Sequence, residues 1–457
     1  MRKKCARLLA LGMILTTILT GCTSGKEVTL PETDGDEQKT ESSVPEETAD
    51  NKGEEADDNK TEDTTLVFWS IGLKLKDDSG IKMPEELAAN RFIAKFEEDH
   101  PGVTIEVIDQ PTDGIHDLFK AANVSEEGPD VIGLWSGNAT NEYQDYLLAL
   151  DEYMTDDEKN MYTGINLCKK DFKEDGEIIA LPYNVTTYNI FYNKEYFAAA
   201  GIEELPQTFD ELLEVCEKLK AADIQPFLVG DSSGESTTWI TSEFMVDLVG
   251  PEKIVDFGTE ALPFNCEEYK TSLETWCRLF EKDYTNKDFA TLSAWDSIQR
   301  FVTGEGAMNI NGSWAIGEME PIMGENIGTF KIPAITADAP FGDYIVSQPG
   351  ANVSVTTYSD NKELAVEFIK YMTGAEFEGE AHLDTGDLPA NNQVDVSIIT
   401  NPISQESYSW VKENKAGIGY DSVISVEASS ELYKLAPTMI GGKMTPDELI
   451  EKLSSIQ

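Results

Sequence analysis

Histidine and basic side chains are scarce in this sequence. Three histidines occur among 457 residues, and 35 Lys and Arg stand against 85 Asp and Glu, which gives a formal net charge of −50. Nucleic acid is therefore not expected as a partner, because binding to phosphates depends on basic patches. No histidine has a metal-ligand spacing to another His or to a Cys, so no metal site is predicted.

Motifs for catalysis and for cofactor binding are missing as well. The chain has no GxSxG, no P-loop and no GxGxxG after a predicted strand. A glycosidase-like pair of carboxylates stays open, although 85 acids bring some pairs together by chance. Asp77-Asp78 could bind Ca²⁺, but it lacks EF-hand spacing. The sequence predicts no catalytic residue, no cofactor and no enzyme.

Six cysteines occur without a CxxC pair, which argues against redox and zinc chemistry. Cys216 lies on the apolar face of a predicted helix and is expected in the core. Cys266 and Cys277 could form a disulfide in an exported protein, and the sequence leaves this open.

The N-terminus has the features of a targeting segment. Four basic residues precede an apolar run from Leu8 to Leu19, which is short for a membrane span. The run ends in Leu-Thr-Gly-Cys, similar to the lipobox of bacterial lipoproteins, in which the Cys is diacylated and becomes the mature N-terminus. We predict a lipoprotein signal peptide over 1–21 and lipidation at Cys22; the alternative is an ordinary secretory signal with an incidental Cys.

Residues 22–64 are predicted to be an acidic, disordered linker. From Thr23 to Thr64 the chain has fifteen acidic residues, four lysines and no aromatic side chain. Such a segment cannot bury enough apolar surface to offset chain entropy. It suits a tether between a membrane and a folded body, and a docking tail for a basic partner is the alternative.

The body that follows alternates predicted strands and helices. "TLVFWS", "PGVTIEVID" and "GPDVIGLWSGN" read as strands, and amphipathic helical patterns separate them. This β-α-β-α-β order predicts an α/β fold with a mostly parallel sheet and helices on both faces.

Tryptophans mark the predicted ends of strands, where ligands bind in open α/β sheets. Trp69, Trp135 and Trp314 take such positions, while Trp239 follows a loop-like stretch and Trp295 opens a predicted helix. Each could instead pack in a core, as is expected for Trp276 and Trp410. Flat aromatic faces flanked by Asn, Ser and Gly suit sugars, whose C–H faces stack on indoles and whose hydroxyls need short polar partners.

The chain resembles the extracellular solute-binding proteins, family 1, of bacterial ABC importers, the group that contains maltose-binding protein. The resemblance covers essentially residues 65–457. It rests on segments that occur in this order: "TLVFWS", "FEEDHPGVTIEV", "GPDVIGLWSGN", "ALPYNVTTYNIFYNKEYFAAAGIEELPQTFDELLEVCEKLKAADIQPF", "FVTGEGAMNINGSWAIG" and "SDNKELAVEFIKYMTGAEF". The stretch "LKLKDDSGIK" and Thr186, where an acid is found in maltose-binding members, depart from the pattern and argue against maltose.

The resemblance implies a type II periplasmic-binding-protein clamshell, in which two α/β lobes joined by hinge crossovers close on a ligand. One lobe would comprise 65–181 and 330–358, and the other 182–329 and 359–457. Ligand-lining positions are implied by this resemblance or, for Trp295, by the tryptophan pattern; they are Trp69, Ser70, Trp135, Asn138, Tyr183, Asn184, Trp239, Trp295, Trp314 and Gly350.

The implied function is a lipid-anchored, monomeric receptor that captures an oligosaccharide outside the cell and delivers it to the transmembrane permease subunits of an ABC importer. A binder of a non-sugar solute on the same fold, a glycan-acting surface hydrolase, and a sensor or adhesin subunit are the alternatives.

Overall fold

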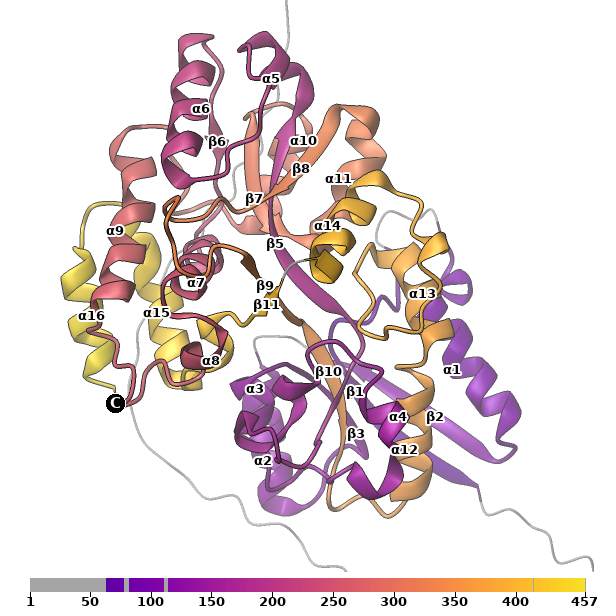
Figure 1. Ribbon diagram of the computed structural model, residues 1–457. Helices are drawn as coiled ribbons and strands as arrows, with labels where there is room; N and C mark the ends of the chain where they lie inside the picture. Colours follow the sequence, from indigo (N-terminus) through magenta and orange to yellow (C-terminus); the bar gives the residue numbers. More distant parts are fainter. Residues whose placement is uncertain (1–62, 78–81, 111–113, 414, 457) are drawn as a thin grey trace, which may run out of the picture. The chain divides into compact units, whose positions relative to one another are not determined.

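The computed structural model describes residues 63–77, 82–110, 114–413 and 415–456, which belong to one compact unit, Lys60–Gln457. The predicted signal peptide, the lipidation site Cys22 and nearly all of the acidic linker lie outside the described residues. Two β-sheets organise the described part of the chain (Figure 1).

The first sheet has helices on both faces. Leu66 and Phe68 of β1 point to a core shared with α1 (Ala88–Asp99), whereas Ile132 and Leu134 of β3 point to a core shared with α2 (Ile115–Ser125). This alternation follows from the two-residue period of a strand. The sheet order is β2 (Val103–Asp109), β1 (Thr64–Ser70), β3 (Val131–Trp135), β10 (Ala351–Val355) and β4 (Leu181–Pro182). β1 pairs in parallel with β2 and β3, and β10 pairs antiparallel with β3 and β4.

The second sheet is built around the long strand β5. The order is β11 (Lys415–Gly417), β9 (Tyr344–Pro349), β5 (Val185–Asn193), β7 (Met308–Gly312) and β6 (Phe227–Leu228), with β8 (Ile327–Lys331) paired to β5. Eight of the nine residues of β5 are buried. Such burial on both faces is typical of a strand covered by helices on each side.

Two groups of helices cover the second sheet. In Figure 1, α10, α11 and α14 lie on one side of β5 and α6, α7, α9 and α15 on the other. The first group comprises α10 (Ala294–Val302), α11 (Ile316–Met323) and α14 (Pro402–Glu413); the second comprises α6 (Phe209–Ala221), α7 (Glu235–Val249), α9 (Glu267–Glu281), α15 (Val426–Ile440) and α16 (Pro446–Ser454). The short helices are α3 (Asn138–Asn141), α4 (Asp156–Lys159), α5 (Lys194–Ala199) and α8 (Pro251–Ile254).

The chain passes between the sheets by short crossovers. β4 of the first sheet is followed within three residues by β5 of the second, and β9 of the second is followed by β10 of the first after one residue. A third passage lies after α13, where Val185 N donates to Leu388 O at 2.7 Å. These crossovers confirm the two-sheet, hinge-connected architecture that the sequence predicts.

Two helices after residue 359 pack on the first sheet, although the expected lobe boundary at residue 359 assigns them to the other lobe. α12 (Lys362–Tyr371) and α13 (Ala375–Thr385) supply Phe368, Ile369 and Phe377 to the core of the first sheet, beside Leu66 and Phe68. They follow β10 directly, so the chain is still on the first sheet when they begin. The chain returns to the second sheet after α13, where Leu388 and Ala390 pack with Val185 of β5, and α14 continues this packing.

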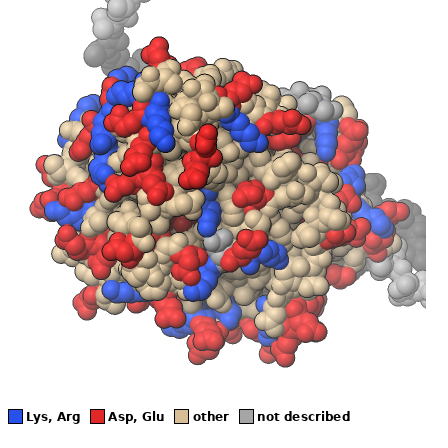
Figure 2. All heavy atoms as spheres, turned by 45° about the horizontal axis from the view of Figure 1, so that its top comes forward, with Lys and Arg blue, Asp and Glu red and all other residues tan. Residues whose placement is uncertain are grey.

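The acidity is distributed over the surface. Figure 2 shows Asp and Glu side chains spread across the visible face, with Lys and Arg scattered among them. Many of these are exposed ion pairs, such as Arg278 with Asp210 at 2.6 Å, and such pairs add little to stability. The face in Figure 2 has no continuous basic patch of the kind that binds nucleic acid.

Candidate ligand-binding site

Three aromatic rings from separate elements meet in the second sheet's core. Tyr188 of β5 stacks on Trp239 of α7, with ring centroids 5.7 Å apart. Trp314, which follows β7, meets Trp239 edge to face at 5.2 Å and Tyr188 at 6.4 Å. We call Tyr188, Trp239 and Trp314 the aromatic cluster. Such ring pairs are each worth about 0.5–1.5 kcal/mol beyond their buried area.

The position of Trp314 follows from the strand before it. β7 pairs with β5 so that Gly312 lies opposite Tyr188, and the chain then enters a 3₁₀ turn, η5 (Ser313–Ala315). The Trp314 ring folds back over Gly312: a Cβ there would lie 1.9 Å from a ring carbon. Tyr188 and Trp239 are 4% and 7% exposed, whereas Trp314 is only partly buried and contacts two separate cores. Trp314 is therefore the most accessible ring of the aromatic cluster.

A substitution at Gly312 tests whether the Trp314 ring contacts the ligand. Its φ of −87° suits any residue, so Gly312→Ala strains the ring and not the backbone. We expect this variant to displace Trp314 and to weaken ligand binding about tenfold or more, since one stacked ring is lost. Gly342→Ala is the matched control, because its Cβ would make only ordinary contacts, at 3.4 Å or more. Calorimetric titration of both variants measures the difference; equal affinities would show that Trp314 does not contact the ligand.

Two polar side chains lie beside the aromatic cluster. The Tyr433 hydroxyl of α15 donates to Oδ2 of Asp421 at 3.1 Å, and Asp421 lies in the 3₁₀ turn η8 (Tyr420–Ser422). Burial raises the pKa of Tyr188 well above its usual value, and the negative charge of Asp421 adds to this rise. Burial also raises the pKa of Asp421. Neither Asp421 nor Tyr433 was among the residues singled out from sequence.

The predicted site residues at the strand ends of the first sheet have different environments. Trp135 ends β3 and is 39% exposed. Trp69 is partly buried and packs with the α2 core, and Ser70 is fully buried. None of the ring contacts among the described residues joins Trp69 or Trp135 to the aromatic cluster.

The predicted polar residues near the crossovers are engaged in contacts with the backbone. The Asn138 amide donates to the carbonyl oxygens of Val423 and, at 2.7 Å, Ile424. The Tyr183 hydroxyl donates to Ile71 O. Oδ1 of Asn184 accepts from Ala351 N at 2.9 Å. These side chains therefore hold the crossover region and its neighbouring loops together.

Gly350 and Trp295 complete the predicted set. A Cβ on Gly350 would lie 2.6 Å from Oγ1 of Thr186 and 2.9 Å from Oδ1 of Asn184, so a glycine is needed where the two crossover strands approach. Trp295 opens α10 as predicted and is 58% exposed, away from any ring contact in the described part of the chain. The loop-like stretch predicted before Trp239 is limited to residues 232–234, because α7 begins at Glu235 and Trp239 lies inside it. Trp276 and Trp410 are buried, as predicted.

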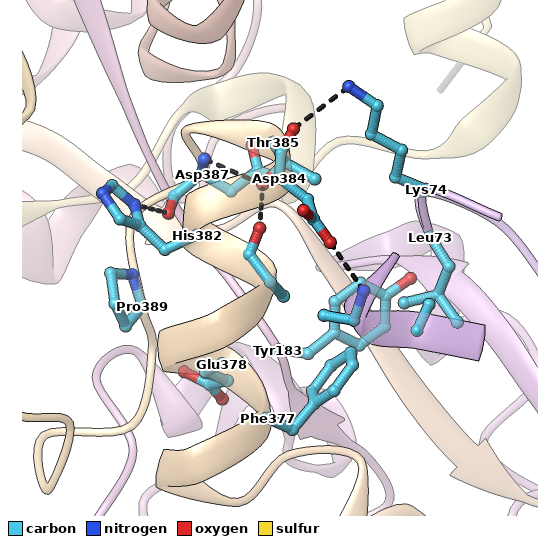
Figure 3. Close-up of a pocket in the computed structure, with 14 residues that line it drawn as sticks. Leu73, Lys74, Tyr183, Phe377, Glu378, His382, Asp384, Thr385, Asp387 and Pro389 are labelled. Atoms are coloured by element: carbon cyan, nitrogen blue, oxygen red, sulfur yellow. Dashed lines mark hydrogen bonds between the residues drawn. The ribbon is translucent and has the colours of Figure 1, made fainter. Parts of the chain in front are cut away.

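A small cavity in the first sheet's region is unsuited to a sugar. Figure 3 shows it between Tyr183, the residues after β1, and α13. Its volume is about 20 Å³, room for a single water molecule. Lys74 Nζ donates to Asp384 O at 3.0 Å, and Ala88 N donates to Oδ2 of the same residue at 2.6 Å (Figure 3). Asp384 therefore fastens the N-terminus of α1 to α13, which is a structural role.

Four cysteines lie among the described residues. Cys168, Cys216, Cys266 and Cys277 are all free, so the disulfide left open by the sequence is not formed. Cys216 is fully buried, as predicted. Within the described ranges no group of three or more His, Cys, Asp or Glu side chains could hold a metal ion, and no helix there is long and apolar enough to cross a membrane.

Comparison with known proteins identifies the family to which this architecture belongs. The family model described as "Bacterial extracellular solute-binding protein" matches residues 82–378, well over half of the chain. The chain belongs to this family. The extracellular solute-binding proteins are binders of solutes, and the two sheets with their crossovers have the family's type II periplasmic-binding-protein fold.

Relatives within the family have low sequence identity to this chain, but the similarity extends over most of each chain. The Multiple sugar-binding protein of Streptococcus mutans is 23% identical over 64% of this chain and 70% of its own length. The Maltotriose-binding protein of Pyrococcus abyssi is 23% identical over 70% and 69%. An uncharacterized ABC transporter extracellular-binding protein of Pyrococcus horikoshii is 24% identical over 81% and 80%.

Solved structures agree in fold. A chitin oligosaccharide binding protein superposes with a TM-score of 0.74 at 22% identity, over 86% of this chain and 97% of that one. The GacH receptor of Streptomyces glaucescens, described unliganded and with acarbose, gives 0.67 at 20% identity over 86% and 97%. These similarities establish the fold but do not identify the ligand of this chain.

Proposed function

We propose that this protein is the substrate-binding subunit of an ABC importer and that it captures a neutral oligosaccharide at the aromatic cluster. The observation that carries the proposal is the meeting of Tyr188, Trp239 and Trp314 from three elements of one core, with Trp314 accessible. An indole face stacks on the C–H face of a pyranose. The names of relatives that bind multiple sugars, maltotriose and chitin oligosaccharides support a carbohydrate.

The charges near the aromatic cluster favour a neutral ligand over an anionic one. Other relatives, such as the UgpB proteins of Brucella, are named for binding sn-glycerol-3-phosphate. A phosphate needs cationic partners, whereas the ionisable side chains that act on Tyr188 of the aromatic cluster are two acids, Asp421 and Glu243, and two tyrosines, Tyr420 and Tyr433. A neutral ligand therefore fits this site better than an anionic one.

Ligand capture would proceed by closure of two lobes about the crossovers, a hinge motion. We assign β1–β4, β10, α12 and α13 to one lobe and the second sheet with its helices to the other. This assignment differs from the boundaries expected from sequence, which put α12 and α13 in the second lobe. The closed form would then be presented to the permease, and the protein would release its ligand unchanged rather than turn it over.

Calorimetric titration against maltotriose, xylotriose, chitotriose, stachyose and glycerol-3-phosphate tests the ligand class. We expect saturable binding of at least one oligosaccharide and a rise in Tm with its concentration, because a ligand that binds only the native state stabilises it by mass action. Binding of glycerol-3-phosphate alone, or release of shorter sugars from any oligosaccharide, would contradict the proposal.

We further propose that the protein is anchored at the extracellular face of the membrane through lipid on Cys22. A diacylated cysteine carries two chains, and two chains are enough for stable anchoring. Cys22→Ser is expected to move the full-length protein from the membrane fraction to the medium or periplasm without changing ligand affinity. Membrane fractionation and the mass of the mature N-terminal peptide check this; unchanged membrane retention of the variant would rule out the anchor.

A further inference from the structure

Asp421 differs from the other buried carboxylates of the second sheet's core. Asp231, Glu243 and Asp247 each accept a hydrogen bond from a backbone N–H, of Thr237, Val346 and Ile335 respectively, at 2.8–3.0 Å. Asp421 Oδ2 accepts from the Tyr433 hydroxyl instead, and its Oδ1 is buried without a well-formed hydrogen bond among the described residues, although the backbone N–H groups of Asp421 and Ser422 lie near the carboxylate. A buried acceptor with no partner costs free energy, so an exception of this kind calls for an explanation.

The loop that carries Asp421 is held in place from two other elements. Gln348 of β9 accepts from Gly419 N at 2.7 Å and donates to Ser422 Oγ at 2.8 Å. From the first sheet's side, the Asn138 amide donates to the two carbonyl oxygens that follow the turn. The carboxylate is thus preorganised, and little entropy would be lost on using it for binding.

The carboxylate lies close to the aromatic cluster. Gln348, which holds the Asp421 loop, lies opposite Thr186, two residues before Tyr188 in β5. The hydroxyl of Tyr420 lies 2.7 Å from that of Thr241, two residues after Trp239 in α7. The charge of Asp421 also contributes, after burial, to the raised pKa values of Tyr188 and Tyr433. Glu378 also has a buried oxygen without a partner, but it lines the cavity of about 20 Å³ in the first sheet's region. Asp421 therefore combines a buried acceptor that lacks a well-formed hydrogen bond with a position beside stacked rings.

Stacked rings and a carboxylate oxygen without a well-formed hydrogen bond together match the two surfaces of a sugar. The rings suit the apolar face, and a carboxylate oxygen accepts hydrogen bonds from hydroxyls at the rim, more strongly than a neutral acceptor does. We propose that Asp421, oriented by Tyr433, is the residue that accepts the hydroxyls of the bound oligosaccharide and so determines which sugars this protein selects. This inference rests on the proposed function and deepens it.

The test is calorimetric titration of Asp421→Asn with the oligosaccharide that binds the wild type best among maltotriose, xylotriose, chitotriose and stachyose. The variant keeps the shape of the side chain but loses its charge and one acceptor. We expect affinity to fall about 10- to 100-fold, the range for a hydrogen bond to a charged group, and the order of preference among the four sugars to change. Glu427→Gln, an exposed acid nearby on α15, is the matched control and should bind as the wild type does.

The outcomes separate the two proposals. Wild-type affinity and sugar preference in Asp421→Asn, alongside weakened binding in Trp314→Ala, would overturn the role of Asp421 and leave the sugar-binding function standing. Absence of binding of all four sugars by the wild type would overturn both. If Asp421→Asn folds poorly by thermal melting without ligand, Tyr433→Phe decides, because it frees the carboxylate without removing it. A several-fold loss of affinity supports the proposal, and an unchanged affinity overturns it.

Discussion

Trp314→Ala is expected to lower both the affinity for oligosaccharide and the stability of the fold. Loss of one stacked ring should cost about 1–3 kcal/mol of binding free energy, or roughly 5- to 150-fold in Kd. The ring also contacts two cores, so we expect the free energy of unfolding to fall by roughly 2–4 kcal/mol. Calorimetric titration and chemical denaturation measure the two effects separately.

Two variants isolate the role of the ring. Trp314→Phe keeps an aromatic face and should recover most of the affinity. Trp410→Ala removes a buried tryptophan of α14 and should lower stability without changing the Kd of the folded protein. If Trp314→Ala loses stability but keeps wild-type affinity, Trp314 is a core residue only and the aromatic cluster is not the binding site.

The second large effect is a loss of stability as pH rises. Burial raises the pKa of Asp231 and of Asp247 from 3.8 to about 7, and it raises that of Glu243 as well. Between pH 3.8 and about pH 7, Asp231 and Asp247 keep their protons in the folded protein, whereas the same side chains have released them in the unfolded chain. The stabilisation is therefore complete below about pH 4 and is lost as pH rises through about 7, by up to about 4 kcal/mol for each aspartate.

Denaturation with urea at pH 5, 6, 7 and 8 measures this slope. Asp231→Asn and Asp247→Asn should each flatten it, because an amide does not titrate. Carboxylates with a lowered pKa, such as Glu158, act below the window and do not disturb the comparison. A wild-type stability that increases from pH 5 to pH 8, or variants with the wild-type slope, would show that these acids are ionised in the folded protein.

The sequence was a good guide to the parts of the architecture that depend on local periodicity. Alternating strand and helix patterns predicted the parallel strands β1, β2 and β3, and the resemblance to the family implied the crossovers. The expectation of a mostly parallel sheet was wrong for β10 and β5, which pair antiparallel with their neighbours. The return of α12 and α13 to the first sheet was missed, since it depends on β10 pairing with β3 more than two hundred residues earlier. Such non-local pairing leaves no mark in the periodicity of either segment.

The site was only partly foreseeable from the sequence. Trp239 and Trp314 were singled out and meet in the aromatic cluster, whereas Tyr188 was missed because β5 is buried along almost its whole length and shows no alternation. Asp421 was one of 85 acids, with no local pattern to separate it. Asn138 and Asn184 were chosen as polar residues for a ligand, but Asn138 donates to backbone carbonyls and Asn184 bonds Ala351 N and the Asp387 carboxylate, which only the three-dimensional structure reveals.

The most direct test of the account is a crystal structure of the protein with the oligosaccharide that binds best in the calorimetric panel. We predict a pyranose ring stacked on Trp314, with sugar hydroxyls within hydrogen-bonding distance of Asp421 Oδ1. An oligosaccharide bound away from the aromatic cluster, for example against the exposed Trp295 or Trp135 alone, would show that the aromatic cluster is not the binding site.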